Sequence, residues 1–183
     1  MKLKESIYVI GEGLTEKYYF QHLKRLKKYS CVIRPRFFSK KNSIYYLEKR
    51  TKELLSADVT VICAFDADVS QRNKYEKIKL QKFITEYKNN DKVIICDSLP
   101  SIEFWFLLHF KKTNKHFANY NAIRDELRKY IPDYDKTEKY LMQDKWAKIL
   151  ILKQDTAIDY GKKLKSGSGA YSNIYKAIEI LEK

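Results

Sequence analysis

Six acidic residues lie at or just beyond the ends of segments that are typical of buried β-strands. They are Glu12, Glu16, Asp66, Asp68, Asp97 and Glu103. Carboxylates that are drawn together repel each other unless a proton or a cation lies between them, and their oxygens favour Mg²⁺ or Mn²⁺ over softer ions. If the strands share one edge of a sheet, these residues are therefore predicted to bind a hard divalent metal.

Each acid also has a structural explanation when it is taken alone. Glu16 is placed to complement the positive end of a helix. Asp66 or Asp68 is placed to cap the helix that follows. Glu12 lies between two glycines, which indicates a turn where the backbone approaches something closely, but the spacing completes neither a dinucleotide-binding fingerprint nor a Walker lysine loop. The combination of acids, rather than any single one, favours a metal site.

Strands and helices are predicted to alternate over the first hundred residues. The predicted strands cover residues 6–10, 31–38, 59–65 and 92–96, and the predicted helices between them cover residues 15–28, 43–55 and 75–87. Because such an order needs crossover connections, we expect a mostly parallel four-stranded sheet with helices on both faces. Ligands of these sheets bind beyond the carboxyl ends of the strands. The acids are therefore expected to meet there.

The sequence changes character after Pro100. Further helices are predicted over residues 101–110, 121–130, 144–164 and 172–181, so the C-terminal portion is expected to be helical throughout. We expect an α/β core in residues 1–100 and a helical portion in residues 101–183. The two should pack together as a single compact domain, since 183 residues is a usual size for one core.

The charge of the chain favours a polyanionic partner. Lysine and arginine number 37 against 23 acidic residues, which gives a net charge of +14, and residues 1–56 alone hold 14 basic and 5 acidic side chains. A lysine-rich proteome would produce part of this excess without any partner. Tyr45 and Tyr46 lie among basic residues and are placed to stack bases, although an ordinary amphipathic helix explains them equally well. The candidate nucleic-acid-binding residues are Lys40, Lys41, Lys49 and Arg50.

Other classes of protein are disfavoured. No apolar run approaches the roughly 18 residues of a membrane span, so we expect a soluble, cytoplasmic protein. The three cysteines are far apart and form no CxxC pair, which argues against a disulfide framework and against structural zinc. The three histidines also lack metal-binding spacing. His109 ends an apolar helix, a position more typical of a packed residue than of a catalyst.

Three blocks of the sequence resemble a known family. Residues 9–20 read VIGEGLTEKYYF, residues 65–68 read FDAD and residues 98–110 read SLPSIEFWFLLHF. In order and spacing they are similar to the RloB-like proteins, which carry a Toprim-type (topoisomerase-primase) domain like that of the OLD family nucleases and are associated with bacterial restriction and antiphage loci. The likeness continues through residues 134–137 and 170–181. Lys17 stands where proline is expected, and Val69-Ser70 stand where a further acid is common, which leaves the number of metal ligands open.

The resemblance implies a nuclease that depends on Mg²⁺ or Mn²⁺, hydrolyses RNA or DNA and acts in antiphage defence, with tRNA as one option for its target. It implies that Glu12 transfers a proton or binds the metal, and that Asp66 and Asp68 hold the metal. Glu16 and Glu103 are weaker candidates for a second cation. Lys136, in the matching Tyr-x-Lys-Thr segment, is the candidate catalytic residue that would hold the phosphate.

A second class of function stays open. The acidic cluster could hold a metal-bound nucleotide, or the basic face could recruit nucleic acid, in a non-catalytic sensor subunit of a defence complex. A partner ATPase or another subunit of the defence system would then perform the chemistry. A receiver-type phosphoacceptor sheet is disfavoured, because a single acid, Glu12, follows the first strand where an acidic pair is expected.

Overall fold

The sheet lies at the centre of the computed structural model, which describes residues 6–11, 13–33, 43–68, 73–164 and 169–183. Its described strands are β1 (Ile7–Gly11), β2 (Val32–Ile33), β3 (Thr60–Asp66), β4 (Val93–Leu99) and β5 (Tyr171–Ser172), in the order β2-β1-β3-β4-β5. The first four pair in parallel, and β5 runs antiparallel to β4. The predicted α/β fold with a mostly parallel sheet is therefore confirmed.

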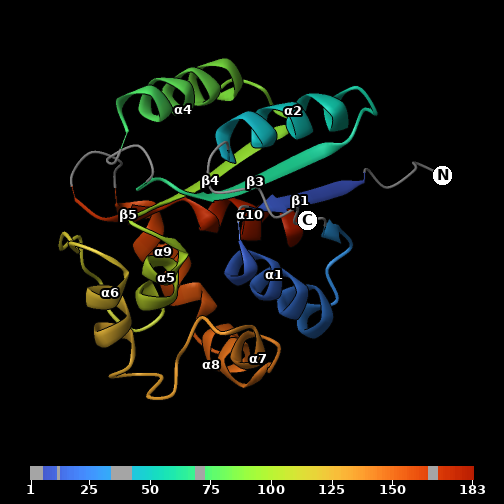
Figure 1. Ribbon diagram of the computed structural model, residues 1–183. Coiled ribbons are helices and arrows are strands. Elements are labelled where there is room, and N and C mark those ends of the chain that lie inside the picture. The colour runs from blue at the N-terminus through green and yellow to red at the C-terminus, as the bar shows by residue number, and fades with distance from the viewer. Residues whose placement is uncertain (1–5, 12, 34–42, 69–72, 165–168) are drawn as a thin grey trace.

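Helices cover both faces of this sheet (Figure 1). α2 (Ser43–Leu55) and α4 (Lys74–Tyr87) lie on one face, and α1 (Leu14–Lys27), α5 (Ile102–Leu108) and α10 (Ile174–Leu181) lie on the other. Side chains of β3 alternate between the two resulting cores. Val61, Cys63 and Phe65 pack with α2 and α4, whereas Ile62 and Ala64 pack in the larger core on the opposite face. A strand that is covered on both sides needs a nearly continuous apolar sequence, which is what residues 60–65 provide.

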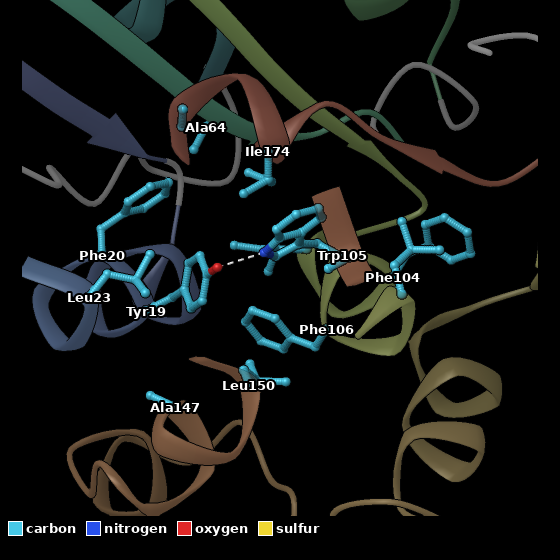
Figure 2. Close-up of a cluster of buried hydrophobic side chains, with 14 of the residues drawn as sticks. Tyr19, Phe20, Leu23, Ala64, Phe104, Trp105, Phe106, Ala147, Leu150 and Ile174 are labelled. Atoms are coloured by element: carbon cyan, nitrogen blue, oxygen red, sulfur yellow. Dashed lines mark hydrogen bonds between the residues drawn. The ribbon is translucent and has the colours of Figure 1, made fainter. Parts of the chain in front are cut away.

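The larger core is built around α5 (Figure 2). Every side chain of this helix is buried, and Trp105 lies near its middle. Burying an indole leaves its N–H in need of an acceptor, and the Nε1–H of Trp105 donates to the hydroxyl of Tyr19 on α1 at 2.6 Å. The Tyr19 ring also lies 5.1 Å from the ring of Phe106, measured between centroids. These contacts fix α1 against α5.

The C-terminal portion differs from the sequence prediction in four places. The helix predicted over residues 144–164 is broken into α8 (Lys145–Ile151) and α9 (Gln154–Lys163), because α8 packs on α1 whereas α9 packs on α5 and α10. A short helix, α7 (Glu138–Leu141), was not predicted, and the helix predicted from residue 121 is α6 (Tyr120–Leu127). The portion is also not wholly helical, because β5 extends the sheet. No described helix is long and apolar enough to cross a membrane.

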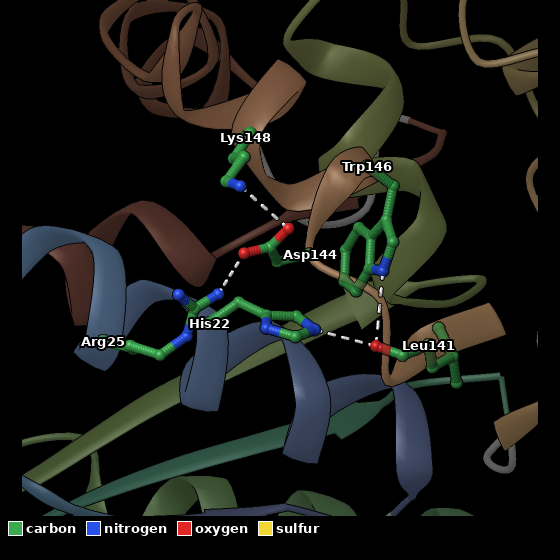
Figure 3. Close-up of polar contacts among 6 residues, drawn as sticks. All are labelled: His22, Arg25, Leu141, Asp144, Trp146 and Lys148. Carbon is green, nitrogen blue, oxygen red and sulfur yellow. Dashed lines mark hydrogen bonds and ion pairs between the residues drawn. The ribbon is translucent and has the colours of Figure 1, made fainter. Parts of the chain in front are cut away.

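Polar contacts join α1 to α7 and α8 (Figure 3). The Nε2–H of His22 donates to the carbonyl oxygen of Leu141 at 2.8 Å, and Arg25 forms an ion pair with Asp144. One turn nearer the start of α1, the hydroxyl of Tyr18 donates to Glu138 at 2.6 Å. The contacts recur every three or four residues along α1, so they lie on one face of the helix. They set the position of residues 134–137, which precede α7, relative to the start of α1.

The turn between β1 and α1 depends on the absence of a side chain at Gly11. A Cβ atom there would lie 2.9 Å from the Cβ of Glu16, closer than real Cβ contacts. We predict that Gly11→Ala lowers the free energy of unfolding by about 1–3 kcal/mol, measured by urea denaturation, because α1 would have to shift away from β1.

Gly13→Ala is the matched control for this prediction. Among the residues that the structure describes, a Cβ at Gly13 would meet only Oε2 of Glu16, at 3.0 Å, and the end of a flexible side chain can move. Its loss of stability should therefore be the smaller of the two. Equal losses for the two variants would contradict the close approach of α1 to β1.

Candidate functional site

Asp66 and Asp68 lie at the carboxyl end of the central strand, as the sequence predicts. Asp66 is the last residue of β3, and its Oδ1 accepts the backbone N–H of Ile102, the first residue of α5, at 2.9 Å. The intervening Ala67 is buried, and its N–H donates to the carbonyl oxygen of Ser98 at 2.7 Å, which continues the pairing of β3 with β4. Asp68 follows, half-buried. Glu12, the third residue predicted here, lies outside the described residues.

Glu16 belongs to the same edge of the sheet. It lies in the first turn of α1 and is buried, with 4 % of its surface exposed. Its carboxylate lies against the glycine turn, because the space next to Gly13 is bounded by Oε2 of Glu16. A buried acid in the first turn of a helix is favoured by the positive end of the helix dipole. The strand, the turn and the helix together hold this carboxylate at the end of β1.

Glu103 is the most completely enclosed acid of the described site. It lies in the first turn of α5 with none of its surface exposed. One carboxylate oxygen, Oε2, accepts the hydroxyl of Ser101 at 2.5 Å. The other, Oε1, accepts the hydroxyl of Tyr134 at 2.9 Å and lies 3.0 Å from the Nζ of Lys136. Three donors from two separate segments thus stabilise a buried negative charge.

Lys136 enters this edge from the helical portion. Its Nζ lies 3.0 Å from Oε1 of Glu103 and 4.1 Å from the centre of the Tyr120 ring. Burial lowers the pKa of Lys136, but the attraction of Glu103, Asp66 and Glu16 outweighs burial and raises that pKa above its usual value. The side chain is therefore an ammonium at neutral pH. The structure brings this cation together with three of the predicted acids.

Asp97 does not join them. The sequence placed it beside the loop after the fourth strand, but β4 runs on to Leu99, so Asp97 lies within the strand. Its carboxylate accepts the hydroxyl of Tyr171 and the side-chain amide of Asn173, each at 2.7 Å. These donors come from β5 and the residue after it. The carboxylate therefore holds β5 on the sheet, which is why the strand could extend through an acid.

The predicted nucleic-acid-binding residues are only partly described. Lys40 and Lys41 lie outside the described residues. Lys49 is exposed on α2, and Arg50 forms an ion pair with Glu53 at 2.8 Å. Tyr45 and Tyr46 are exposed neighbours on the same helix. Binding of nucleic acid at this helix stays a prediction.

Two residues of the site were not predicted from the sequence. Ser101 and Tyr134 donate to Glu103, yet neither was singled out as a functional residue. The only signal for Tyr134 was its position two residues before Lys136 in the segment that matches the family. From the sequence, the segment predicts one functional lysine, whereas the structure shows two donors from it, Tyr134 and Lys136, on one carboxylate.

His109 is a packed residue rather than part of this edge. It caps the end of α5, and its Nδ1–H donates to the carbonyl oxygen of Trp105 at 2.9 Å. Burial lowers the pKa of His109 to about 4, although its hydrogen bonds to backbone carbonyls act to raise that pKa. The imidazole is therefore neutral at pH 7, which suits a residue packed edge-on against the Trp105 ring.

The residues present fit a hydrated Mg²⁺ or Mn²⁺ better than an enclosed metal cage. Within the described ranges, no three His, Cys, Asp or Glu side chains form a group that could hold a metal ion. Mg²⁺ usually keeps several waters and takes one or two carboxylates from the protein. Asp66 and Asp68 would supply that donor set, with Glu12 as a further predicted ligand.

Removing one donor from Glu103 should weaken the fold. We predict that Tyr134→Phe lowers the free energy of unfolding by about 1–3 kcal/mol, because it leaves a buried carboxylate without one of its partners. The measurement is urea denaturation at pH 7. Tyr160→Phe is the control, since that half-buried hydroxyl has no described hydrogen-bond partner, and it should change stability little. Equal effects of the two changes would contradict the role given to Tyr134.

The burial of His109 predicts a dependence of stability on pH. The unfolded chain binds a proton at this residue below about pH 6.5, whereas the folded protein binds it only near pH 4. Stability is therefore lost as the pH falls through this window, by about 2 kcal/mol between pH 7 and pH 5. In urea denaturation, His109→Gln should show a smaller loss over that range. Exposed His116→Gln should keep the full loss, and an unchanged loss in His109→Gln would refute the assignment.

Comparison with known proteins supports the resemblance seen in the sequence. No curated protein and no solved structure matches the chain. The model of one family, described as RloB-like protein, matches residues 7–181. The match includes the glycine turn, the acids at the end of β3, the whole of α5 and the segment that carries Lys136. The chain therefore belongs to the RloB-like family.

Proposed function

We propose that this RloB-like protein is a Toprim-type nuclease that uses Mg²⁺ or Mn²⁺ to hydrolyse phosphodiester bonds in RNA or DNA. One observation carries the proposal. Asp66 lies at the carboxyl end of β3, and it shares the attraction of the Lys136 ammonium with Glu16 and Glu103. Acids at that end of a parallel sheet, with a cation beside them, suit a substrate that is itself an anion and reacts on a metal.

Each residue of the site would have its own role in the reaction. Asp66 and Asp68 would hold the metal, and the backbone N–H of Ile102 would orient Asp66 by its bond to Oδ1. When bound, the metal supplies charge stabilisation to the phosphoryl oxygens and activates water. Lys136 would hold the phosphate through its ammonium, which Glu103 and the Tyr120 ring position. Glu12 remains the candidate for proton transfer.

The excess of basic residues supports a nucleic acid as the substrate. A net charge of +14 draws polyanions to the surface and speeds their association. A role in bacterial antiphage defence, with tRNA as one candidate target, follows from the resemblance. In this proposal the cleavage of host or phage nucleic acid would limit infection.

One observation favours a second candidate function. Glu103 is engaged by three donors, and the described residues contain no group of three metal-binding side chains. Such a site also suits a non-catalytic sensor subunit that binds a nucleic acid or a nucleotide and acts with a partner ATPase or another defence-system subunit. Both candidates share the site and differ in whether the bound anion is cut.

Asp66→Asn tests the first proposal. The asparagine keeps an oxygen that can accept the N–H of Ile102, so the fold should persist and the melting temperature should stay the same or rise. We predict that cleavage of total cellular RNA or DNA in the presence of Mn²⁺ falls at least about 100-fold, because the metal loses a negative ligand. EDTA should stop cleavage by the unaltered protein.

Asp133→Asn provides the matched control. Asp133 is exposed, and its only described ion pair is with Lys145 at 3.8 Å, so its loss should leave cleavage unchanged. If Asp66→Asn unfolds the protein, the residue is structural and the proposed site is wrong. If the unaltered protein binds RNA with a steep salt dependence yet cuts nothing with any divalent metal, the sensor function is selected instead.

A further inference from the structure

We propose that Lys136 is a built-in second cation of the site, so that one divalent metal ion binds per chain where two carboxylate-bound ions would otherwise be needed. The inference rests on the proposed function, because it concerns the metal of the same site. It replaces the expectation that Glu16 and Glu103 hold a second ion. Four features of the described residues support it.

The first feature is the engagement of Glu103. Both of its oxygens are already engaged: Oε2 accepts a hydrogen bond from Ser101, and Oε1 accepts one from Tyr134 and pairs with Lys136, while no part of the side chain is exposed. Because Glu103 has no exposed surface, a metal ion could reach its carboxylate only by taking the place of one of these three donors, of which the ammonium is the one that carries a positive charge. The side chain of Lys136 is 34 % exposed whereas that of Glu103 is fully buried, so removing the ammonium would leave an uncompensated charge on an enclosed carboxylate. The lysine therefore occupies the position that a cation on Glu103 would take.

The second feature is the support given to Lys136 by the residues around it. Its ammonium lies over the Tyr120 ring, at 4.1 Å from the centre, which is a favourable cation–π distance. The backbone N–H of Lys136 donates to Asp135 at 2.8 Å, and the Nε–H of Arg128 donates to the carbonyl oxygen of Tyr134 at 2.9 Å. These two hydrogen bonds fix the backbone around the lysine, one by joining it to the end of α6 and the other within its own turn. A charge held in this way needs no reorganisation when substrate arrives.

The third feature is electrostatic. The Nζ of Lys136 lies 3.0 Å from Oε1 of Glu103 on α5, and the negative charges of Asp66 on β3 and Glu16 on α1 also attract it. One fixed positive charge therefore offsets the negative charges of carboxylates from three elements. In two-metal sites the ions lie about 3.5–4 Å apart and stabilise the attacking and the leaving oxygens. Here an ammonium supplies one of the two charges and cannot be removed by chelation.

The fourth feature is the docking of the segment that carries the lysine. Tyr18, His22 and Arg25 on α1 hold α7 and the start of α8 through Glu138, Leu141 and Asp144. Glu16 lies at the start of the same helix α1. The distance between the lysine segment and the acids is therefore set by a helix that contributes one of the acids.

The number of bound Mn²⁺ ions tests the proposal. Free Mn²⁺ is measured by electron paramagnetic resonance during titration of the full chain, so the readout does not depend on cleavage. The unaltered protein should bind one ion. Lys136→Met should bind two, because Glu103 and its neighbours then lack their cation and Mn²⁺ can enter with waters completing its shell. Lys136→Arg, which keeps the charge, should bind one.

Two further variants separate charge from packing. Lys139→Met removes an exposed lysine three residues away and should bind one ion, as the unaltered protein does. Lys136→Met with Glu103→Gln removes both partners of the ion pair and should also bind only one. If Lys136→Met unfolds without metal, the proposal requires that Mn²⁺ restore its folding, seen as a rise in melting temperature larger than that of Lys139→Met.

The outcomes are distinct for the two proposals. Two ions in the unaltered protein would overturn the role of Lys136 and leave the metal-dependent nuclease standing. One ion in both the unaltered protein and folded Lys136→Met would also overturn it, as would failure of Mn²⁺ to restore an unfolded Lys136→Met. No bound Mn²⁺ in the unaltered protein would overturn the proposed function and, with it, this inference.

Discussion

The buried carboxylate of Glu103 sets the main constraint on the site. A charged group with no exposed surface is tolerated only when donors surround it, and here they are Ser101, Tyr134 and Lys136. Two of the three come from a segment more than 30 residues further along the chain. The α6–α7 segment must therefore lie against the start of α5 for the helix to be stable. The same contact brings an ammonium close enough to Asp66 for the two charges to attract each other.

The sheet explains why α5 begins where it does. Asp66 ends the central strand and accepts the first N–H of α5, so the carboxyl end of β3 and the amino end of α5 meet at one carboxylate. The rest of α5 packs on β4, α6 and α9, and Trp105 is bonded to Tyr19 of α1. Moving α5 would therefore disturb the sheet edge and the helical portion together. The site lies where these two parts of the chain are joined.

The fold was predictable where a pattern depends on near neighbours. The alternation of strands and helices, the continuous apolar sequence of β3 and the bounds of α2 follow from local periodicity. The break between α8 and α9 did not, because the buried positions on either side of Leu152 fit one continuous helix. Only their packing against different partners divides it. The two residues of β5 carry no strand pattern and depend on Ser98, Leu99 and Asp97 of β4.

The site was predictable to the same extent. Parallel strands place their carboxyl ends together, so the position of Asp66 and Asp68 followed from the order of elements. The ion pair of Lys136 with Glu103 did not, because it joins residues whose contact depends on the docking of α6 and α7. A crystal structure with Mn²⁺, using the anomalous signal of the metal, tests this arrangement of one metal ion and one ammonium. We expect one peak beside Asp66 and Asp68, with Lys136 still bonded to Glu103. A peak on Glu103 with the lysine displaced, or no peak at this edge of the sheet, would contradict it.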